Sequence, residues 1–116
     1  MQRVLLVGMN EPLLRSRAAV LAKTGAEVVV SPPEEITSTG KRGQVDLLVM
    51  CHSIRAEHRE AVAAAWRKHW PRLRILQLVR NESEAAFPGR HADAVAVSLD
   101  PGALLERSRR LLKAAG

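Results

Sequence analysis

The sequence predicts an α/β domain built on a parallel sheet of five strands in the order 2-1-3-4-5, with helices on both faces. Two observations lead to this prediction. Short, continuous apolar runs alternate with segments of helical periodicity, which is typical of parallel strands joined by crossover helices. The length of 116 residues is that of one ordinary domain, so we expect residues 1–116 to form a single unit.

The first quarter of the chain predicts a strand, a helix and a second strand. The apolar run Arg3 to Gly8 lacks polar alternation, as expected of a strand covered on both faces. Pro12 suits the first turn of the helix that follows, and Gly25 suits its C-terminus. The second strand is expected from Ala26 to Val30. The apolar stripe of the helix comprises Leu14, Ala18 and Leu21.

The middle of the chain repeats this alternation. Pro32 is expected to begin a short, weakly patterned helix that ends by Gly40 to Gly43. The apolar run Val45 to Cys51 predicts another central strand. A helix from Ala56 to His69 follows, and Pro71 stops it.

The last part of the chain predicts two more strands, Leu73 to Val79 and Ala92 to Leu99. Between them only Asn81 to Phe87 can be helical, because a Pro-Gly pair follows, so the fourth helix is expected to be shortened to a turn or two. Asp100 suits the N-cap of the final helix, with Pro101 at its first position.

These elements in this order predict the flavodoxin-like, doubly wound fold. In such sheets, ligands bind at the C-terminal ends of the first and third strands, where the strand order reverses. The segments to examine for function are therefore residues 8–11 and residues 51–54.

Composition and charge narrow the classes of function. No apolar run approaches the roughly 18 residues of a membrane span, and we expect a cytoplasmic protein, in agreement with its single cysteine, Cys51. The net charge is +6, but the basic residues are scattered along the chain with acidic residues among them. The only aromatic residues are Trp66, Trp70 and Phe87. Nucleic-acid binding is therefore not expected.

Three segments resemble the receiver domains of bacterial response regulators, the CheY-like family. Residues Val4 to Arg15 resemble the start of these domains, in which a hydrophobic strand leads into a helix that begins Pro-Leu-Leu-Arg. Val45 to Cys51 resembles their third strand, and Ala92 to Val97 resembles their fifth. The resemblance implies a pocket at the strand ends with an acidic pair that binds magnesium, a phosphoacceptor aspartate, a Ser or Thr, and a lysine.

Each of these five positions departs from the pattern that the resemblance implies. The acidic pair falls on Gly8 and Met9, the acceptor on Cys51, the hydroxyl residue on Val79 and the lysine on Ser98. Magnesium needs hard oxygen ligands and phosphoryl transfer needs a nucleophilic carboxylate, so we expect neither a bound metal nor phosphorylation. The sequence thus predicts a degenerate pocket in a receiver-like framework.

Other motifs with a chemical meaning are absent or have a simpler interpretation. Cys51 beside His52 could be a reactive thiol, although a cysteine at the end of a buried strand is more often an apolar filler. The four histidines have no zinc-ligand spacing, and no dinucleotide or Walker glycine motif occurs. We therefore expect no cofactor and no enzyme activity.

The sequence is best interpreted as a pseudo-receiver of a two-component system, which signals independently of phosphorylation through protein–protein contact. The partner would be another protein or a second copy of the chain, bound through a helix and strand face. As an alternative, the degenerate pocket could bind a small metabolite or an anion. The candidate contacts to a ligand or partner are Asn10, His52, Arg80 and Trp70. Trp66 and Trp70 lie one turn apart, a spacing that favours at least one of them as core, and Trp70 could instead be a partly exposed anchor.

Overall fold

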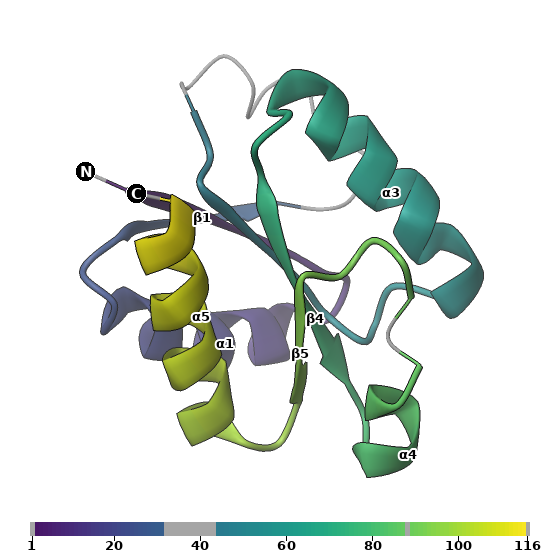
Figure 1. Cartoon of the computed structure of the whole chain (residues 1–116). Helices are drawn as coiled ribbons and strands as arrows, with labels where there is room; N and C mark the ends of the chain where they lie inside the picture. Colours follow the sequence, from purple (N-terminus) through teal and green to yellow (C-terminus); the bar gives the residue numbers. More distant parts are fainter. Residues whose placement is uncertain (1, 32–43, 88, 116) are drawn as a thin grey trace.

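A parallel sheet of five strands forms the centre of the computed structural model, which describes residues 2–31, 44–87 and 89–115. The strand order β2-β1-β3-β4-β5 confirms the prediction (Figure 1). The strands are β1 (Arg3–Val7), β2 (Glu27–Ser31), β3 (Leu47–Met50), β4 (Arg74–Val79) and β5 (Ala94–Val97). The helices are α1 (Glu11–Ala22), α3 (Ala56–His69), α4 (Glu82–Ala85) and α5 (Pro101–Ala115). The helix expected after Pro32 lies outside the described residues.

The sheet separates two apolar cores, which explains why its central strands are apolar without alternation. Along β1, Val4 and Leu6 belong to the core shared with α1 and α5, whereas Leu5 and Val7 belong to the core shared with α3. All four side chains are fully buried. Figure 1 shows α1 and α5 on one side of the sheet and α3 on the other.

Local signals in the sequence place the ends of the helices. Asn10 caps α1, since its side-chain oxygen accepts a hydrogen bond from the Leu13 amide at 3.2 Å. Gly25 follows the helix with a φ of 86°, a conformation that glycine adopts without steric cost. Asp100 caps α5 in the same way as Asn10, accepting from the Ala103 amide at 3.0 Å. These contacts confirm the start of both helices.

The fourth helix is as short as the sequence predicts. Asn81 caps α4 by accepting from the Glu84 amide at 3.0 Å, and the helix ends at Ala85. Gly89 follows with a φ of 98°. The chain therefore reaches β5 with only one helical turn on that side, which changes the surface that α4 and β5 present.

At the edge of the sheet where the strands begin, here called the N-terminal edge, two aspartates hold neighbouring strands together. The Arg3 amide donates to the Asp46 carboxylate at 2.9 Å, and the Ile75 amide donates to the Asp93 carboxylate at 2.7 Å. These side-chain bonds add to backbone bonds, since the Asp46 amide donates to the Arg3 carbonyl at 2.9 Å and the Asp93 amide to the Ile75 carbonyl at 2.8 Å. β3 and β5 begin just after these aspartates, later than the predicted runs that start at Val45 and Ala92.

Among the described residues, no helix combines the length and the apolar composition that crossing a bilayer requires.

Candidate functional site

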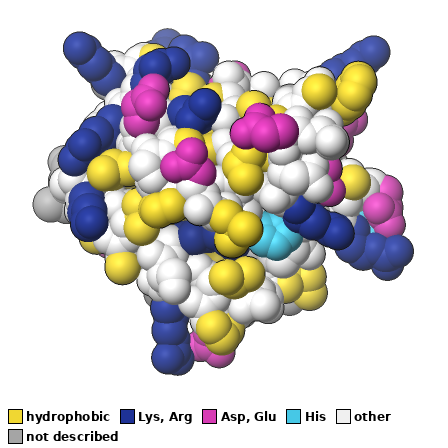
Figure 2. Space-filling model, turned by 90° about the horizontal axis from the view of Figure 1, so that it is seen from below, with side chains coloured by type: hydrophobic (Ala, Val, Ile, Leu, Met, Phe, Trp, Pro, Cys, Tyr) yellow, Lys and Arg dark blue, Asp and Glu magenta, His cyan; other side chains and the backbone are white. Residues whose placement is uncertain are grey.

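The opposite edge of the sheet, here called the C-terminal edge, carries the five positions of the predicted pocket. Gly8 and Met9 follow β1, Cys51 follows β3, Val79 ends β4 and Ser98 follows β5. Figure 2 views the molecule from this side and shows hydrophobic side chains beside a histidine near the centre, with Lys and Arg side chains projecting at the rim.

Gly8 and Cys51 are packed too closely for any side chain at position 8. A Cβ atom added to Gly8 would lie 2.9 Å from the Cβ of Cys51 and 3.0 Å from a methyl carbon of Leu14. The backbones are held there because the Cys51 amide donates to the Val7 carbonyl at 2.9 Å. A carboxylate at position 8 would therefore require the ends of β1 and β3 to move apart.

Arg17 occupies the site, although the sequence indicates it only as one of many scattered basic residues. Its side chain extends from α1 and is only 5% exposed. The Nη2 atom donates to the Ser98 hydroxyl and lies 3.4 Å from the Nδ1 atom of His52. Arg17 therefore links the residues that follow β3 and β5, which the sequence predicted as separate positions.

The Arg17 guanidinium has no carboxylate partner among the described residues. Its Nη1 atom is buried and has no hydrogen-bond acceptor there either. Two nearby arginines have such partners, since Arg15 pairs with Glu11 and Arg80 pairs with Glu84. Arg59, which is also buried, instead donates to the backbone carbonyls of Ile54 and His52. A buried, unpaired cation is energetically costly, so Arg17 is the unusual feature of this edge.

Burial disfavours the charged forms of the Cys51 thiol and the His52 imidazole. Burial raises the pKa of the Cys51 thiol, and the positive charge of Arg17 offsets only part of this effect. Burial, together with the charges of Arg17 and Arg80, lowers the pKa of His52. A neutral imidazole does not activate a buried, neutral thiol, so the geometry favours Cys51 as an apolar filler.

Neither a protein-family model nor a curated protein matches the sequence. Solved structures do match. A CheY-like response regulator receiver domain protein from Methanospirillum hungatei is similar, with a TM-score of 0.77 and 18% identity over 99% of this chain and 96% of that one. A response regulator from Thermotoga maritima, solved in complex with Mg²⁺-BeF, has a TM-score of 0.77 and 22% identity over 96% of this chain and 99% of its own.

A third similar structure is the signal receiver domain of an HD domain-containing protein from Pseudomonas fluorescens. It has a TM-score of 0.77 and 16% identity, and the match covers 98% of this chain and 88% of that one. The chain has the CheY-like receiver fold. The expected fold is thus confirmed at the level of architecture, at identities too low to carry site residues across.

Within this receiver fold, Arg17 brings a positive charge to the place where the resemblance puts a lysine. Ser98 stands at that position, and its hydroxyl accepts from Arg17. The spacing of Arg17, three residues after Leu14 and four before Leu21, places it on the buried stripe of α1. That spacing was the sequence signal that could have identified it.

Two of the five positions, Met9 and Val79, have side chains that take no part in the contact between Arg17, Ser98 and His52. The Met9 side chain is 69% exposed, while its amide donates to the Ser53 hydroxyl at 3.0 Å. Val79 is fully buried in the core shared by the sheet and its helices, and its carbonyl accepts from the Ser98 amide at 2.7 Å. The structure thus brings together Gly8 with Cys51, and Ser98 with Arg17.

The candidate contacts around the pocket are already engaged in local structure. Asn10 caps α1, and Arg80 pairs with Glu84 at 3.7 Å with most of its side chain exposed. His52 accepts through its carbonyl from Arg59 at 3.2 Å, in addition to its ring contact. Of these residues, His52 lies closest to the charged centre of the site.

The expectation that Trp70 is a partly exposed anchor was wrong. Trp70 is only 8% exposed and stacks on Trp66, with 5.6 Å between the ring centroids and an interplanar angle of 10°. Both indoles belong to the core under α3. A residue four positions after Trp66 shares its buried face, so the second ring completes the core and is not a partner contact.

The described residues contain no group of three or more His, Cys, Asp or Glu side chains placed to hold a metal ion. Gly8 and Met9 supply no carboxylate at the positions where the receiver resemblance places the magnesium ligands.

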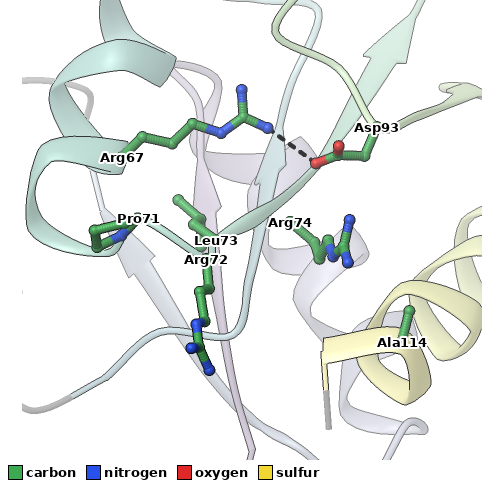
Figure 3. Close-up of a pocket in the computed structure, with 7 residues that line it drawn as sticks. All are labelled: Arg67, Pro71, Arg72, Leu73, Arg74, Asp93 and Ala114. Carbon is green, nitrogen blue, oxygen red and sulfur yellow. Dashed lines mark hydrogen bonds and ion pairs between the residues drawn. The ribbon is translucent and has the colours of Figure 1, made fainter.

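A cavity of about 510 Å³ lies at the opposite, N-terminal edge (Figure 3). Arg67 points across it to Asp93 at 3.0 Å, and Arg72 and Arg74 extend from the segment that leads into β4. Its charged side chains surround Asp93, whose carboxylate already accepts a hydrogen bond from the backbone of β4. The cavity therefore belongs to the structural contacts at the start of the sheet.

Proposed function

We propose that residues 1–116 form a receiver-like signalling module of a two-component system that works without phosphorylation and contacts a protein partner. The contact between Gly8 and Cys51 carries this proposal. It leaves no room for a carboxylate at position 8, and it places a neutral thiol where a phosphoacceptor would stand. We assign no catalytic residue, and we expect the reducing cytoplasm as the compartment, because free thiols persist there.

The remaining positions support the same conclusion. Val79 offers no hydroxyl to follow a phosphoryl group, and Ser98 offers no cation to pair with it. Arg17 supplies a positive charge, but in the part of the chain that the structure describes it pairs with no carboxylate that could accept a phosphoryl group or bind magnesium. Charge alone does not perform the transfer.

Incubation with acetyl phosphate and magnesium tests this proposal, with the mass of the intact protein as the readout. We expect no phosphoryl adduct, whereas a receiver domain that carries the acidic pair and the aspartate should be modified under the same conditions. A stoichiometric, base-labile adduct on this chain would overturn the proposal.

Exposed apolar side chains at the C-terminal edge are the best candidates for partner contact. Met9 is 69% exposed, Leu99 is 85% exposed and Phe87 is 87% exposed. All three follow an element that ends at this edge: β1, β5 and α4 respectively. Large apolar residues grouped at one edge are typical of interaction surfaces.

Light scattering after size exclusion tests self-association through this surface. If the partner is a second copy, the wild type dimerises as its concentration rises, and Leu99→Ser with Phe87→Ser weakens the dimer. A strict monomer over a wide concentration range would remove the homodimer version and leave a different protein as the partner. The double variant should keep the wild-type melting temperature, because both side chains are exposed.

A further inference from the structure

The buried charge of Arg17 is not explained by the fold. Its Nη2 atom has the Ser98 hydroxyl as an acceptor, but its Nη1 atom has none among the described residues. Taking a guanidinium out of water is costly unless its donors find acceptors. A buried guanidinium without a carboxylate calls for an anion from outside the chain.

The neighbouring residues do not supply that anion. Burial raises the pKa of the Cys51 thiol, so the thiol stays protonated at neutral pH. The carboxylate of Glu84 pairs with Arg80, and that of Glu11 pairs with Arg15 on the exposed side of α1. No ion pair among the described residues includes Arg17.

Arg17 also lines a pocket between α1 and the start of α5. The pocket has a volume of about 220 Å³, and its polar wall includes Arg17, Ser16 and Ser98. Its other walls are apolar, with Leu13 and Val20 from α1 and with Leu99, Pro101 and Leu104 from the start of α5. One cation at the end of an apolar pocket matches a ligand with one anionic group and an apolar body.

We propose that this pocket binds a small aliphatic monocarboxylate, whose carboxylate accepts hydrogen bonds from Arg17 and whose chain lies against Leu13, Val20 and Leu104. The volume equals roughly seven water molecules at about 30 Å³ each, which suits a chain of about four to six carbons. Because Nη1 is shielded from solvent, the carboxylate reaches it by a small displacement of side chains at the Ser98 wall.

A carboxylate fits better than phosphate for two reasons. The planar guanidinium forms paired hydrogen bonds with a carboxylate, and a single cation balances a single negative charge. Phosphate carries more charge and no apolar part, so the leucine and valine walls would contribute nothing to its binding. This inference rests on the pocket and on Arg17, not on the proposed protein partner, although Leu99 belongs both to the pocket wall and to the exposed apolar surface.

Titration of the ¹⁵N-labelled wild type with isovalerate, followed by amide chemical shifts, is the direct test. We expect saturable shifts within residues 13–20 and 98–104, with a dissociation constant in the millimolar range for so small a ligand. The matching alcohol, 3-methylbutanol, should bind at least about tenfold more weakly because it lacks the charge. Inorganic phosphate should give no saturable shifts in these segments.

The variant Arg17→Met distinguishes a role of Arg17 in ligand binding from a role in stabilising the fold. Without ligand, we expect its melting temperature to equal or exceed that of the wild type, because a buried unpaired charge is replaced by an apolar stem. Isovalerate binding should weaken at least about tenfold, and Arg17→Lys should restore part of it. Arg15→Met is the matched control, since Arg15 is 80% exposed on the same helix and should leave binding unchanged.

Two results would overturn the inference. The first is the absence of saturable shifts with isovalerate in the wild type, or equal shifts with the alcohol. The second is a marked loss of melting temperature in Arg17→Met without ligand, which would show that Ser98 and His52 satisfy the guanidinium and that Arg17 is a structural residue.

Discussion

The two edges of the sheet differ in how completely their charged side chains are hydrogen-bonded. At the N-terminal edge, the carboxylates of Asp46 and Asp93 accept from backbone amides of the neighbouring strands, and Asp93 also pairs with Arg67. At the C-terminal edge, the buried Arg17 contacts the Ser98 hydroxyl and the His52 ring, and it has no carboxylate partner among the described residues. The carboxylates of the first edge have a structural use, whereas the Nη1 atom of Arg17 at the second edge has none.

This difference indicates where to look for binding. A charged group whose hydrogen bonds complete the sheet needs no ligand to explain it, whereas a buried cation with unused donors does. The C-terminal edge is also where doubly wound folds bind their ligands. The following changes test the contrast, from the largest expected effect to the smallest.

Asp93→Ala should have the largest effect, because it removes the acceptor for both the Ile75 amide and Arg67. We expect the free energy of unfolding to fall by about 2 to 3 kcal/mol, mostly from the unsatisfied backbone amide. Urea denaturation measures it. Asp93→Asn keeps an acceptor oxygen and should lose only about half as much. Equal losses for the two variants would show that the ion pair with Arg67, rather than the backbone bond, stabilises this edge.

Gly8→Ala should destabilise the C-terminal edge by about 2 kcal/mol, since the added methyl would meet the Cβ of Cys51. Cys51→Gly in the same chain should remove most of this penalty, and a double-mutant cycle by urea denaturation measures the coupling. Gly102→Ala is the control, because a Cβ there meets nothing closer than 3.4 Å. Additive effects of the first two changes would contradict the close contact.

His91 tests a buried polar group that does have a partner. Its Nε2 atom lies 2.9 Å from the side-chain oxygen of Gln77, and burial lowers its pKa despite the nearby Glu60. The unfolded chain therefore takes up a proton at higher pH than the folded one. Stability should be complete above pH ~6.5 and should fall as the pH drops through the lower folded pKa, by no more than about 1.4 kcal/mol per pH unit.

Chemical denaturation at a series of pH values measures this loss, and His91→Gln should reduce it. His52, whose pKa is also lowered, keeps a part of the slope in that variant. An unchanged slope in His91→Gln would assign the whole effect to His52 and its neighbours.

Ser108→Ala should have the smallest effect. Ser108 is fully buried in α5, and its hydroxyl has no hydrogen-bond partner among the described residues. Removing an unsatisfied hydroxyl should leave stability unchanged or raise it by up to about 1 kcal/mol, as measured by thermal unfolding. A loss would show that this hydroxyl, unlike the Nη1 atom of Arg17, has an acceptor in solution.

The helices and strands could be predicted from the sequence where the apolar periodicity and the residues that end an element agree. The helix Ala56–His69 has the predicted bounds because its pattern is regular and Pro71 follows. The shortness of α4 followed from the space before Pro88 and Gly89. The starts of β3 and β5 were less predictable, because the side chains of Asp46 and Asp93 bond the neighbouring strands there, and a residue pattern does not contain such bonds.

The site was harder to predict because it depends on a side chain that crosses between elements. The five substituted positions could be placed from the resemblance, but the role of Arg17 could not. A long, charged side chain is normally expected on the outer face of α1, and only its spacing from Leu14 and Leu21 indicates otherwise. Trp70 was misplaced for the reverse reason, since its stacking on Trp66 buries a ring at the end of a helix.

The contact between Gly8 and Cys51 also limits how this chain can change. An aspartate introduced at position 51 would find Arg17 as a counter-ion, but any side chain at position 8 would still meet the Cβ of residue 51. An acidic site cannot therefore be introduced at these positions one substitution at a time, because the ends of β1 and β3 must separate first.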